Sequence, residues 1–224
     1  AWTALIDSGA SNSDTTRVIR RMNNGDLIAA SQVSPGGAAT IRVTRHNPST
    51  GAVLWTTDIS PGDTSDDTND MVIDPATGDA YLASRISITG QQLNWYIWKV
   101  RGSDGATQWA TPFNGSANAN DDPRSICMTS DGNVVVAGQY TLASGAYTTR
   151  VAKYNASTGA QMWAFEPTTE WQTFNQVVAD GSGNAIAAGN NAGASLSTEN
   201  AYIVKFNASG GVVWSQTVNG VNND

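Results

Sequence analysis

Cysteine, histidine and glutamate are nearly missing from this sequence. Among 224 residues there is one cysteine, Cys127, and one histidine, His46, and only three of the 19 acidic residues are glutamates. A single cysteine excludes an intramolecular disulfide and a paired-cysteine metal site, and it is best interpreted as a small buried residue. With one histidine, no Ser/His/Asp set stands out, and the motifs GxSxG, HExxH and the phosphate-binding glycine loop are absent. Two loop carboxylates that cleave a glycoside are the one catalytic arrangement left open.

Charge is also scarce, and little of it is positive. Charged residues make up 14% of the chain, against about a quarter in typical domains, and the net charge is −7. Because phosphate binding needs a basic patch, a nucleic-acid partner is disfavoured. No segment reaches the roughly 18 apolar residues of a membrane span. A surface of Asn, Ser, Thr and Gly, on a chain that begins Ala1-Trp2, favours a processed protein that is secreted or lies at the cell surface.

Five tryptophans recur at gaps of 53, 54, 54 and 51 residues. They are Trp2, Trp55, Trp109, Trp163 and Trp214. The last four each follow a glycine by four residues, and these glycines are Gly51, Gly105, Gly159 and Gly210. A period of about 50 residues with short strands between turns indicates a repeat architecture. We expect these tryptophans and glycines to pack one repeat on the next, because a large aromatic fills a gap and a glycine allows a tight turn.

Each repeat contains four candidate strands. A first strand meets a glycine turn, an apolar second strand follows, a polar loop leads to an alternating third strand, and the fourth carries the tryptophan. This pattern predicts an all-β fold, a β-propeller with four four-stranded antiparallel blades of about 50 residues. The expected blades cover approximately residues 12–59, 66–113, 120–166 and 172–218, within a single propeller over 1–224.

The expected strand count exceeds that of a closed four-bladed ring by one, because the segment around Trp2 looks like a fourth strand without its first three partners. We therefore expect one extra N-terminal strand and a partial ring that belongs to a larger one. Further blades or other copies of the chain would join through the open edges. A self-contained four-bladed ring remains the alternative.

Three segments resemble known propeller repeats. Residues 153–163, KYNASTGAQMW, resemble the tryptophan-docking motif of quinoprotein-type propellers. Residues 177–184 and 212–220 are similar to the repeats of seven-bladed bacterial propellers in surface and secreted proteins. This resemblance, which spans the chain, implies that ligands bind where the loops from fourth to first strand and from second to third strand meet. It does not carry the quinone cofactor, because the adjacent-cysteine pair and the metal-binding acid of that family have no matching positions.

Acidic residues gather in the loops of that expected binding face. They are Asp14, Asp63, Asp66, Asp67, Asp70, Asp121 and Asp122. One interpretation is an acidic mouth that binds a cation, with calcium as a possible ion and Asp14, Asp66 and Asp121 as its candidate ligands. The favoured alternative is that they are turn and capping residues, because no run matches a known calcium loop. No other cofactor is predicted.

Two further groups could take part in binding. Trp171 lies in a loop at the same face, where with Asp66, Asp67, Asp121 and Asp122 it could stack on a sugar or peptide, or simply pack locally. Arg45, Lys99, Lys153 and Lys205 share one position of the repeat. They form either a ring of cations for an anion or pairs with aspartates, and the second is favoured because a feature of every repeat usually serves construction.

The sequence supports one leading hypothesis and two others. The leading one is a non-catalytic binding or scaffold propeller module of a secreted or cell-surface bacterial protein, with a protein or glycan bound through its loop face. The alternatives are a propeller enzyme, quinoprotein-like or glycan-acting, with its site outside this segment, and a structural subunit of an extracellular assembly. The fold alone does not choose among them.

Overall fold

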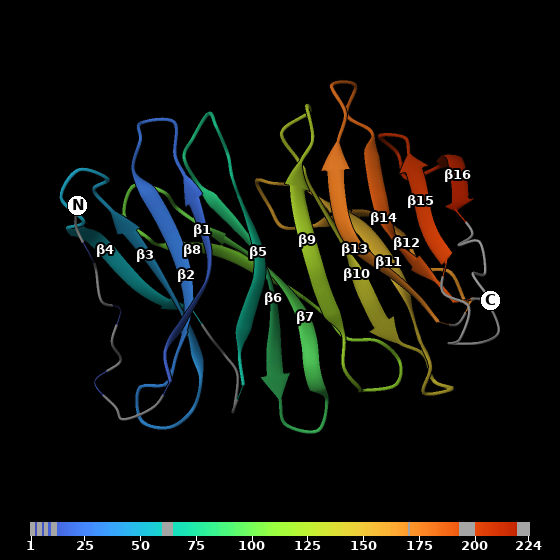
Figure 1. Ribbon diagram of the computed structural model, residues 1–224, viewed down its shortest axis with the longest axis horizontal. Coiled ribbons are helices and arrows are strands. Elements are labelled where there is room, and N and C mark those ends of the chain that lie inside the picture. The colour runs from blue at the N-terminus through green and yellow to red at the C-terminus, as the bar shows by residue number, and fades with distance from the viewer. Residues whose placement is uncertain are drawn as a thin grey trace, which may run out of the picture. The chain divides into compact units, whose positions relative to one another are not determined.

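We describe the protein from a computed structural model, which covers residues 3, 6, 9, 13–59, 65–169, 171–192 and 200–218. These residues form sixteen strands and no helix, in four antiparallel sheets of four strands each (Figure 1). They thus include no helix that is long and apolar enough to cross a membrane. Trp2, the extra N-terminal strand expected around it, and Asp63 lie outside the described residues.

Within each sheet the strands follow one another in chain order, so every connection joins neighbours. The first sheet contains β1 (Thr15–Arg21), β2 (Leu27–Val33), β3 (Thr40–His46) and β4 (Val53–Ile59). The second contains β5 (Asp67–Ile73), β6 (Ala80–Ile88), β7 (Gln92–Val100) and β8 (Thr107–Phe113). The third contains β9 (Asp122–Met128), β10 (Val134–Thr141), β11 (Tyr147–Tyr154) and β12 (Gln161–Phe165). The fourth contains β13 (Gln172–Ala179), β14 (Ala185–Asn191), β15 (Asn200–Phe206) and β16 (Val212–Val218).

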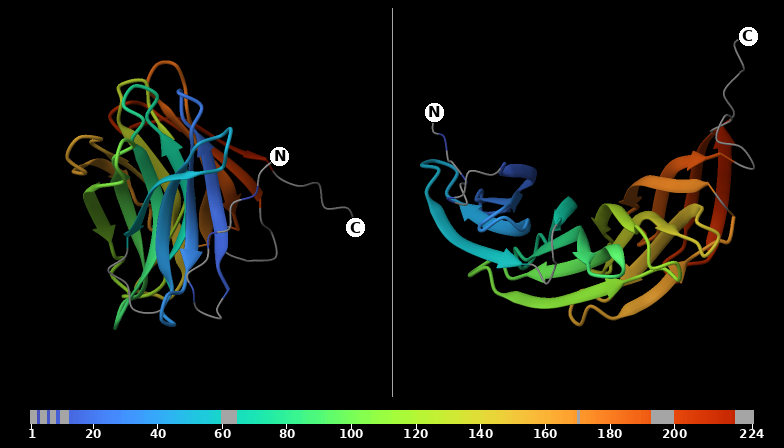
Figure 2. Two further views of the ribbon diagram at one scale, coloured as in Figure 1. Left: turned by 90° about the vertical axis from the view of Figure 1, so that its left-hand side faces the viewer. Right: turned by 90° about the horizontal axis from the view of Figure 1, so that it is seen from below.

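The chain divides into two compact units, residues 1–113 and 114–224, each with two of the sheets. In the first unit, Ile28, Ile41, Leu82 and Trp98 belong to one hydrophobic core that the two sheets share. In the second, Val135, Val151, Phe174 and Phe206 belong to another. All the sheets twist, as expected for strands of L-residues (Figure 2).

The first strand of every sheet carries a bulge. The pairing register shifts between Thr16 and Val18 in β1, between Thr68 and Asp70 in β5, opposite Ala137 and Gly138 in β9, and between Phe174 and Gln176 in β13. A bulge inserts one extra residue and re-aims its side chain. The extra residues are Arg17, Asn69, Arg124 and Asn175. Equivalent positions in the four sheets can therefore be found by counting from the bulge residue of each first strand.

Candidate functional site

Each sheet has two ends with different connections. We call the end with the β-turns that join first to second and third to fourth strands the turn side. The opposite end, with the connections between second and third strands and from one sheet to the next, is the loop side. In Figure 1 the turns β9–β10 and β13–β14 of the second unit lie at the top. Sequence reasoning places the binding site on the loop side.

On the turn side of the first unit, two side chains of the first sheet bind one carbonyl of the second. The Trp55 indole N–H and the Arg45 guanidinium both donate to the Gly102 oxygen, at 3.0 and 2.7 Å. Arg45 also pairs with Asp26 at 2.5 Å. The Trp55 ring lies against Gly105, whose φ is 78° and whose added Cβ would stand 2.7 Å from the ring. Glycine is required there by both the backbone angle and the space.

The second unit repeats this arrangement. The Trp163 indole donates to the Ala208 oxygen at 3.0 Å, and its ring lies 2.7 Å from the position of a Cβ on Gly210, whose φ is 88°. The amine of Lys153, buried like its stem, lies 3.5 Å from the same oxygen and 2.7 Å from Asp131. Two fixed polar contacts and a ring on a glycine therefore join the sheets within each unit.

The shared cation position is paired with a turn aspartate in all four sheets. The pairs are Arg45–Asp26, Lys99–Asp79, Lys153–Asp131 and Lys205–Asp180, at 2.5, 3.1, 2.7 and 2.8 Å. Burial alone would raise the pKa of Asp131, but the hydrogen bonds from Lys153 and Thr129 outweigh it and hold that pKa below its usual range. The Lys205 ammonium does the same for the pKa of Asp180. These cations are thus neutralised in place.

The other tryptophans of the ladder differ in their surroundings. The Trp109 ring lies 5.9 Å from that of Tyr81 in its own sheet. Trp214, on β16, is 40% exposed. Gly51 and Gly159 have positive φ angles of 76° and 73° and close their turns by donating N–H groups to the carbonyls of Asn47 and Asn155.

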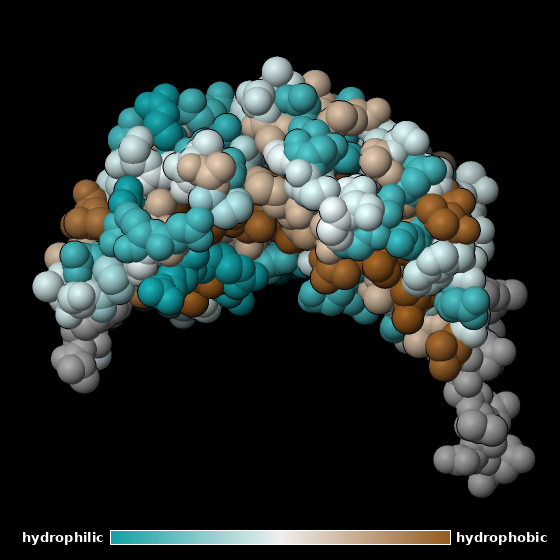
Figure 3. Space-filling view, turned by 90° about the horizontal axis from the view of Figure 1, so that it is seen from above, coloured by the Kyte–Doolittle hydropathy of each residue, from teal (hydrophilic) through white to brown (hydrophobic). Residues whose placement is uncertain are grey.

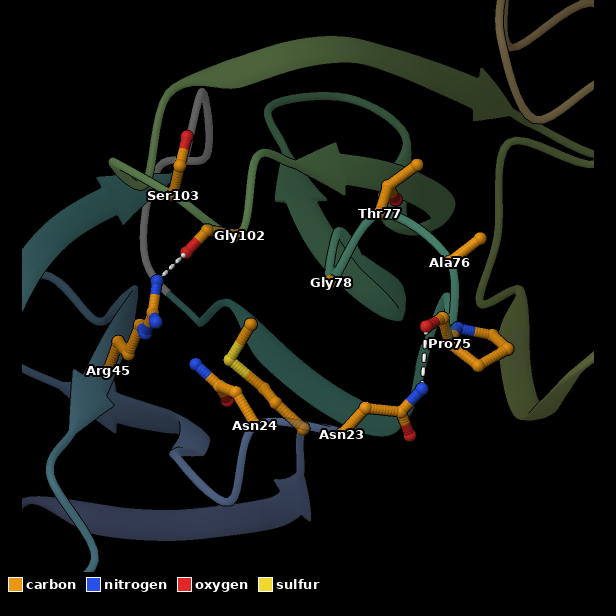
Figure 4. A pocket seen from close by; sticks show the side chains of 10 residues that line it. Asn23, Asn24, Arg45, Pro75, Ala76, Thr77, Gly78, Gly102 and Ser103 are labelled. Atoms are coloured by element: carbon orange, nitrogen blue, oxygen red, sulfur yellow. Dashed lines mark hydrogen bonds between the residues drawn. The ribbon is translucent and has the colours of Figure 1, made fainter.

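A hollow of about 250 Å³ opens on the turn side of the first unit (Figure 4). Its lining comprises Met22, Asn23, Asn24, Arg45, Pro75, Ala76, Thr77, Gly78, Gly102 and Ser103. Asn23 spans it to the Pro75 oxygen at 2.6 Å, and Arg45 is held by the bonds to Gly102 and Asp26. Among the described residues, the lining includes no carboxylate, histidine or cysteine, and its polar side chains are amides, hydroxyls and the Arg45 guanidinium.

The sequence did not indicate this hollow. It forms where Gly78 and Gly102 come together, since a Cβ on Gly102 would stand only 2.0 Å from the Gly78 oxygen. The one signal in the sequence is these two glycines, but a glycine occurs in every β-turn of the four sheets. Figure 3, seen from above, shows mostly hydrophilic and intermediate residues, teal and white, with hydrophobic residues, brown, in separate patches.

On the loop side, three of the predicted acids occupy one repeat position and cap backbone N–H groups. Asp14 accepts from Ser34 at 3.1 Å, and Asp66 accepts from Ser87 at 2.9 Å. Asp121 accepts from Thr141 at 3.1 Å and from Gly115 at 2.7 Å. The fourth sheet has Gln172 at this position. Each carboxylate therefore fixes the connection that leaves the second strand of its own sheet.

Two of these capping acids are buried, and burial opposes the effect of the capping hydrogen bonds on the pKa of Asp121. Asp66 and Asp121 are fully buried, and burial raises the pKa of Asp121 to about 6 despite the hydrogen bonds from Gly115 and Thr141. Within the described ranges, no group of three or more His, Cys, Asp or Glu side chains could hold a metal ion. The three acids proposed as cation ligands each precede the first strand of a different sheet.

The other three of these acids that the structure describes pair with arginines, and Asp70 lies 2.5 Å from Arg20. Asp67 pairs with Arg17 at 2.9 Å and with Arg85 at 3.3 Å. Asp122 pairs with Arg124 at 3.2 Å. The Arg124 guanidinium also donates to Asn175 at 2.5 Å and to Gln139 at 3.2 Å. In both units a bulge arginine thus reaches from one sheet to the first strand of the next.

Trp171 is held in an unusual backbone conformation. Its φ is 60°, its N–H donates to the Tyr147 carbonyl at 2.7 Å, and its own carbonyl accepts from Ala192 at 3.0 Å. The two rings, both half-buried, meet edge to face with centroids 5.2 Å apart. A bulky residue at positive φ is an outlier that the surrounding bonds must enforce. These bonds therefore fix an aromatic pair, Trp171 and Tyr147, at the loop side of the second unit.

The chain resembles solved structures in fold. It is similar to BamB from Moraxella catarrhalis (TM-score 0.50, 16% identity) and to quinohemoprotein alcohol dehydrogenase from Comamonas testosteroni (TM-score 0.53, 15% identity), which are β-propeller proteins. It is also similar to the polysaccharide lyase Uly1 (TM-score 0.54, 12% identity). These matches cover 92%, 90% and 92% of this chain but only 52%, 35% and 49% of the other chains.

No protein-family model matches the chain, and no curated protein matches it. Likeness at such low identity establishes the fold, so the four sheets are blades of the β-propeller type. The prediction of an all-β fold with four four-stranded antiparallel blades is confirmed.

Proposed function

We propose that the protein is a non-catalytic propeller module that binds a glycan on the loop side of its second unit, with Trp171 and Tyr147 as the contact surface. The observation that carries this proposal is the enforced positive φ of Trp171. Such a conformation costs on the order of 1–3 kcal/mol and persists where the surroundings determine it, often at binding sites. A solvent-facing bend would otherwise place a smaller residue there.

The repeat supports the same conclusion. Bulges and strand pairing put Trp171 level with Ser13, Ser65 and Asn120 of the other blades. Tyr147, which pairs with Thr141, is level with Ala39 and Leu93. Because a blade forms without these two aromatics, blade construction does not account for them.

The surroundings of the pair favour stacking over catalysis. Thr148, beside Tyr147, donates to the carbonyls of Pro167 or Thr169, at 3.2 and 2.6 Å, which fixes the segment that leads to Trp171. The nearby carboxylate of Glu166 is bound by the buried Arg150 at 2.8 Å. A rigid aromatic face with neutral polar groups around it suits a sugar ring, which offers C–H groups to the ring and hydroxyls to the rim.

Substitution of Trp171 tests the proposal. We expect Trp171→Ala to weaken the best ligand from a glycan array about tenfold, because aromatic contacts contribute on the order of 1 kcal/mol beyond buried area. Trp171→Gly should lose binding equally while its stability stays within about 1 kcal/mol, since glycine accepts a positive φ. The control is Trp214→Ala, which removes a tryptophan that is 40% exposed on the turn side of its blade.

Calorimetric titration of the four proteins separates the outcomes. Equal affinity of Trp171→Ala and the unchanged protein would refute the aromatic pair as the site. A loss of affinity in Trp214→Ala as large as that in Trp171→Ala would also refute it, because the site would then not be confined to the loop side.

One observation favours a second function, a subunit of a larger assembly. On β4 the face that carries Trp55 ends at Ile59, which is 3% exposed beneath the next blade. On β16 the equivalent face carries Trp214 and Val218, which are 40% and 58% exposed. The proposed occupant of this face is a further blade of the same repeat, offering a turn carbonyl and a positive-φ glycine as Gly102 and Gly105 do.

We also retain three expectations from the sequence as proposals. The low charge and polar composition support secretion or a cell-surface position in a bacterium. A protein partner on the loop side is an alternative to the glycan. A calcium ion, if one binds, would have to displace the backbone groups that Asp14, Asp66 and Asp121 now cap.

A further inference from the structure

On the loop side of the first unit, two arginines share one buried carboxylate. Asp67 is 3% exposed; one of its oxygens lies 2.9 Å from the Arg17 Nε and the other lies 3.3 Å from the Arg85 Nη2. The Asp67 oxygen that faces Arg17 also accepts the backbone N–H of Thr68. Two positive charges therefore share one negative charge, in a protein whose net charge is −7.

Within the part of the chain that the structure describes, most N–H groups of these two guanidiniums have no hydrogen-bond partner. Each guanidinium has five N–H donors in a planar fork. Among the described residues, Arg85 makes the one ion pair to Asp67, and Arg17 adds a bond from its Nη2 to Gln32 at 3.0 Å. Their side chains are 37% and 39% exposed. The site thus offers directed donors at the surface, anchored from below by Asp67.

The chain holds both arginines in place through its strands. Arg17 is the extra residue of the β1 bulge, so its side chain leaves the regular pairing and reaches the neighbouring blade. Arg85 is the direct partner of Asp67 in the β5–β6 ladder. Two blades of one unit therefore contribute to one cationic cluster.

The second blade departs from the repeat at Arg85. The equivalent positions in the other blades carry neutral amides, Gln32, Gln139 and Asn190. In the second unit, Arg124 bridges Asp122 and Gln139, so one arginine serves one aspartate. Because other blades form with an amide at this position, the second guanidinium beside Asp67 is not needed to build the blade.

We infer that Arg17 and Arg85 form an oxyanion site that takes the carboxylate of an acidic sugar, a hexuronate. A guanidinium fork matches a carboxylate in two parallel hydrogen bonds. The choice of a sugar rests on the proposed function, whereas the oxyanion site stands on the first unit alone.

The test compares an oligohexuronate with a neutral oligosaccharide of the same length, by calorimetric titration of the full chain. Arg85→Gln places the residue of two other blades at this position, so the fold is retained. We expect it to weaken the uronate at least about tenfold, because a charge-assisted contact is lost, and to leave the neutral sugar unchanged. Raised salt should weaken the uronate in the unchanged protein more than in this variant.

A matched gain-of-function variant exists in the second unit. Gln139→Arg would give Asp122 a second guanidinium beside Arg124, as Asp67 has, and we expect it to add a second uronate site. Unchanged uronate affinity in Arg85→Gln would overturn the inference, and so would equal affinity of the unchanged protein for the two oligosaccharides. An acidic peptide that binds as tightly, with the same dependence on Arg85, would overturn the assignment to a sugar.

The failure of this inference is distinguishable from that of the proposed function. If Trp171→Ala abolishes binding of a neutral glycan and Arg85→Gln changes nothing, the aromatic site stands and the oxyanion site falls. If Arg85→Gln abolishes uronate binding and Trp171→Ala has no effect on any glycan, the oxyanion site stands without the aromatic one.

Discussion

The turn side and the loop side of the blades follow different rules. On the turn side the same cation–aspartate pair recurs in all four blades, and within each unit a tryptophan joins a carbonyl of the next blade. On the loop side the aspartate cap recurs in three blades, while Trp171 and Arg85 stand where other blades have Ser, Asn or Gln. What recurs builds the blade, and what departs from the repeat is available for binding.

The largest expected effect on stability comes from a substitution on the turn side. Trp163→Ala removes the ring on Gly210 and the bond to Ala208, and should lower the free energy of unfolding by about 3 kcal/mol, as truncation of a packed tryptophan does. Trp214→Ala removes a tryptophan that is itself 40% exposed, and it should lower the free energy of unfolding by less than about 1 kcal/mol. Urea denaturation of both variants measures the difference. Equal losses would mean that docking on the next blade does not stabilise the protein.

A glycine pair sharpens the same point with a smaller effect. Gly210 and Gly132 both have positive φ, at 88° and 77°, but only Gly210 has a ring 2.7 Å from its potential Cβ, while Gly132 has nothing within 4 Å. Gly132→Ala should cost about 1 kcal/mol from backbone strain, and Gly210→Ala about 2 kcal/mol or more from strain and the displaced ring. The difference in thermal midpoint isolates the ring contact. No difference would show that the Trp163 ring moves aside freely.

The smallest expected effect concerns the loop side and pH. The folded pKa of Asp121 is about 6, above its ordinary value of 3.8, so between these values the folded state binds more protons than the unfolded state. Stability from this group is therefore present at low pH and is lost as pH rises through 6, by about 1 kcal/mol between pH 5 and 7. Asp131 and Asp180 have lowered pKa values, so their contributions are lost only below about pH 4.

Asp121→Asn serves as the test of that pH dependence. The variant should flatten the change in unfolding free energy between pH 5 and 7, measured by urea denaturation at each pH. A slope equal to that of the unchanged protein would show that another group causes it. A variant of the turn side, Asp131→Asn, should keep the slope in this window.

The fold was largely predictable because its signals are local. The glycine turns, the alternation of the third strands and the 50-residue period each lie within one repeat, and they predict sheets whose strands the structure places at Thr15–Ile59, Asp67–Phe113, Asp122–Phe165 and Gln172–Val218. The candidate sites were only partly predictable. Trp171 and the loop aspartates were singled out, but Arg17, Arg85 and Tyr147 were not. The difference between Arg85 and the amides at the equivalent positions of the other blades is visible once the strands are aligned in register.

The sequence by itself determined the blades, since hydrophobic period and turn chemistry act between neighbouring residues. Only the tertiary structure decided what the polar residues do, because their roles depend on groups many residues away. Asp66 and Asp121 became buried caps when Ser87 and Thr141 presented N–H groups to them. Asp67 lies beneath a cationic cluster because Arg17 reaches it from the preceding blade. Trp171 takes its positive φ because Tyr147 and Ala192 bind both sides of its backbone.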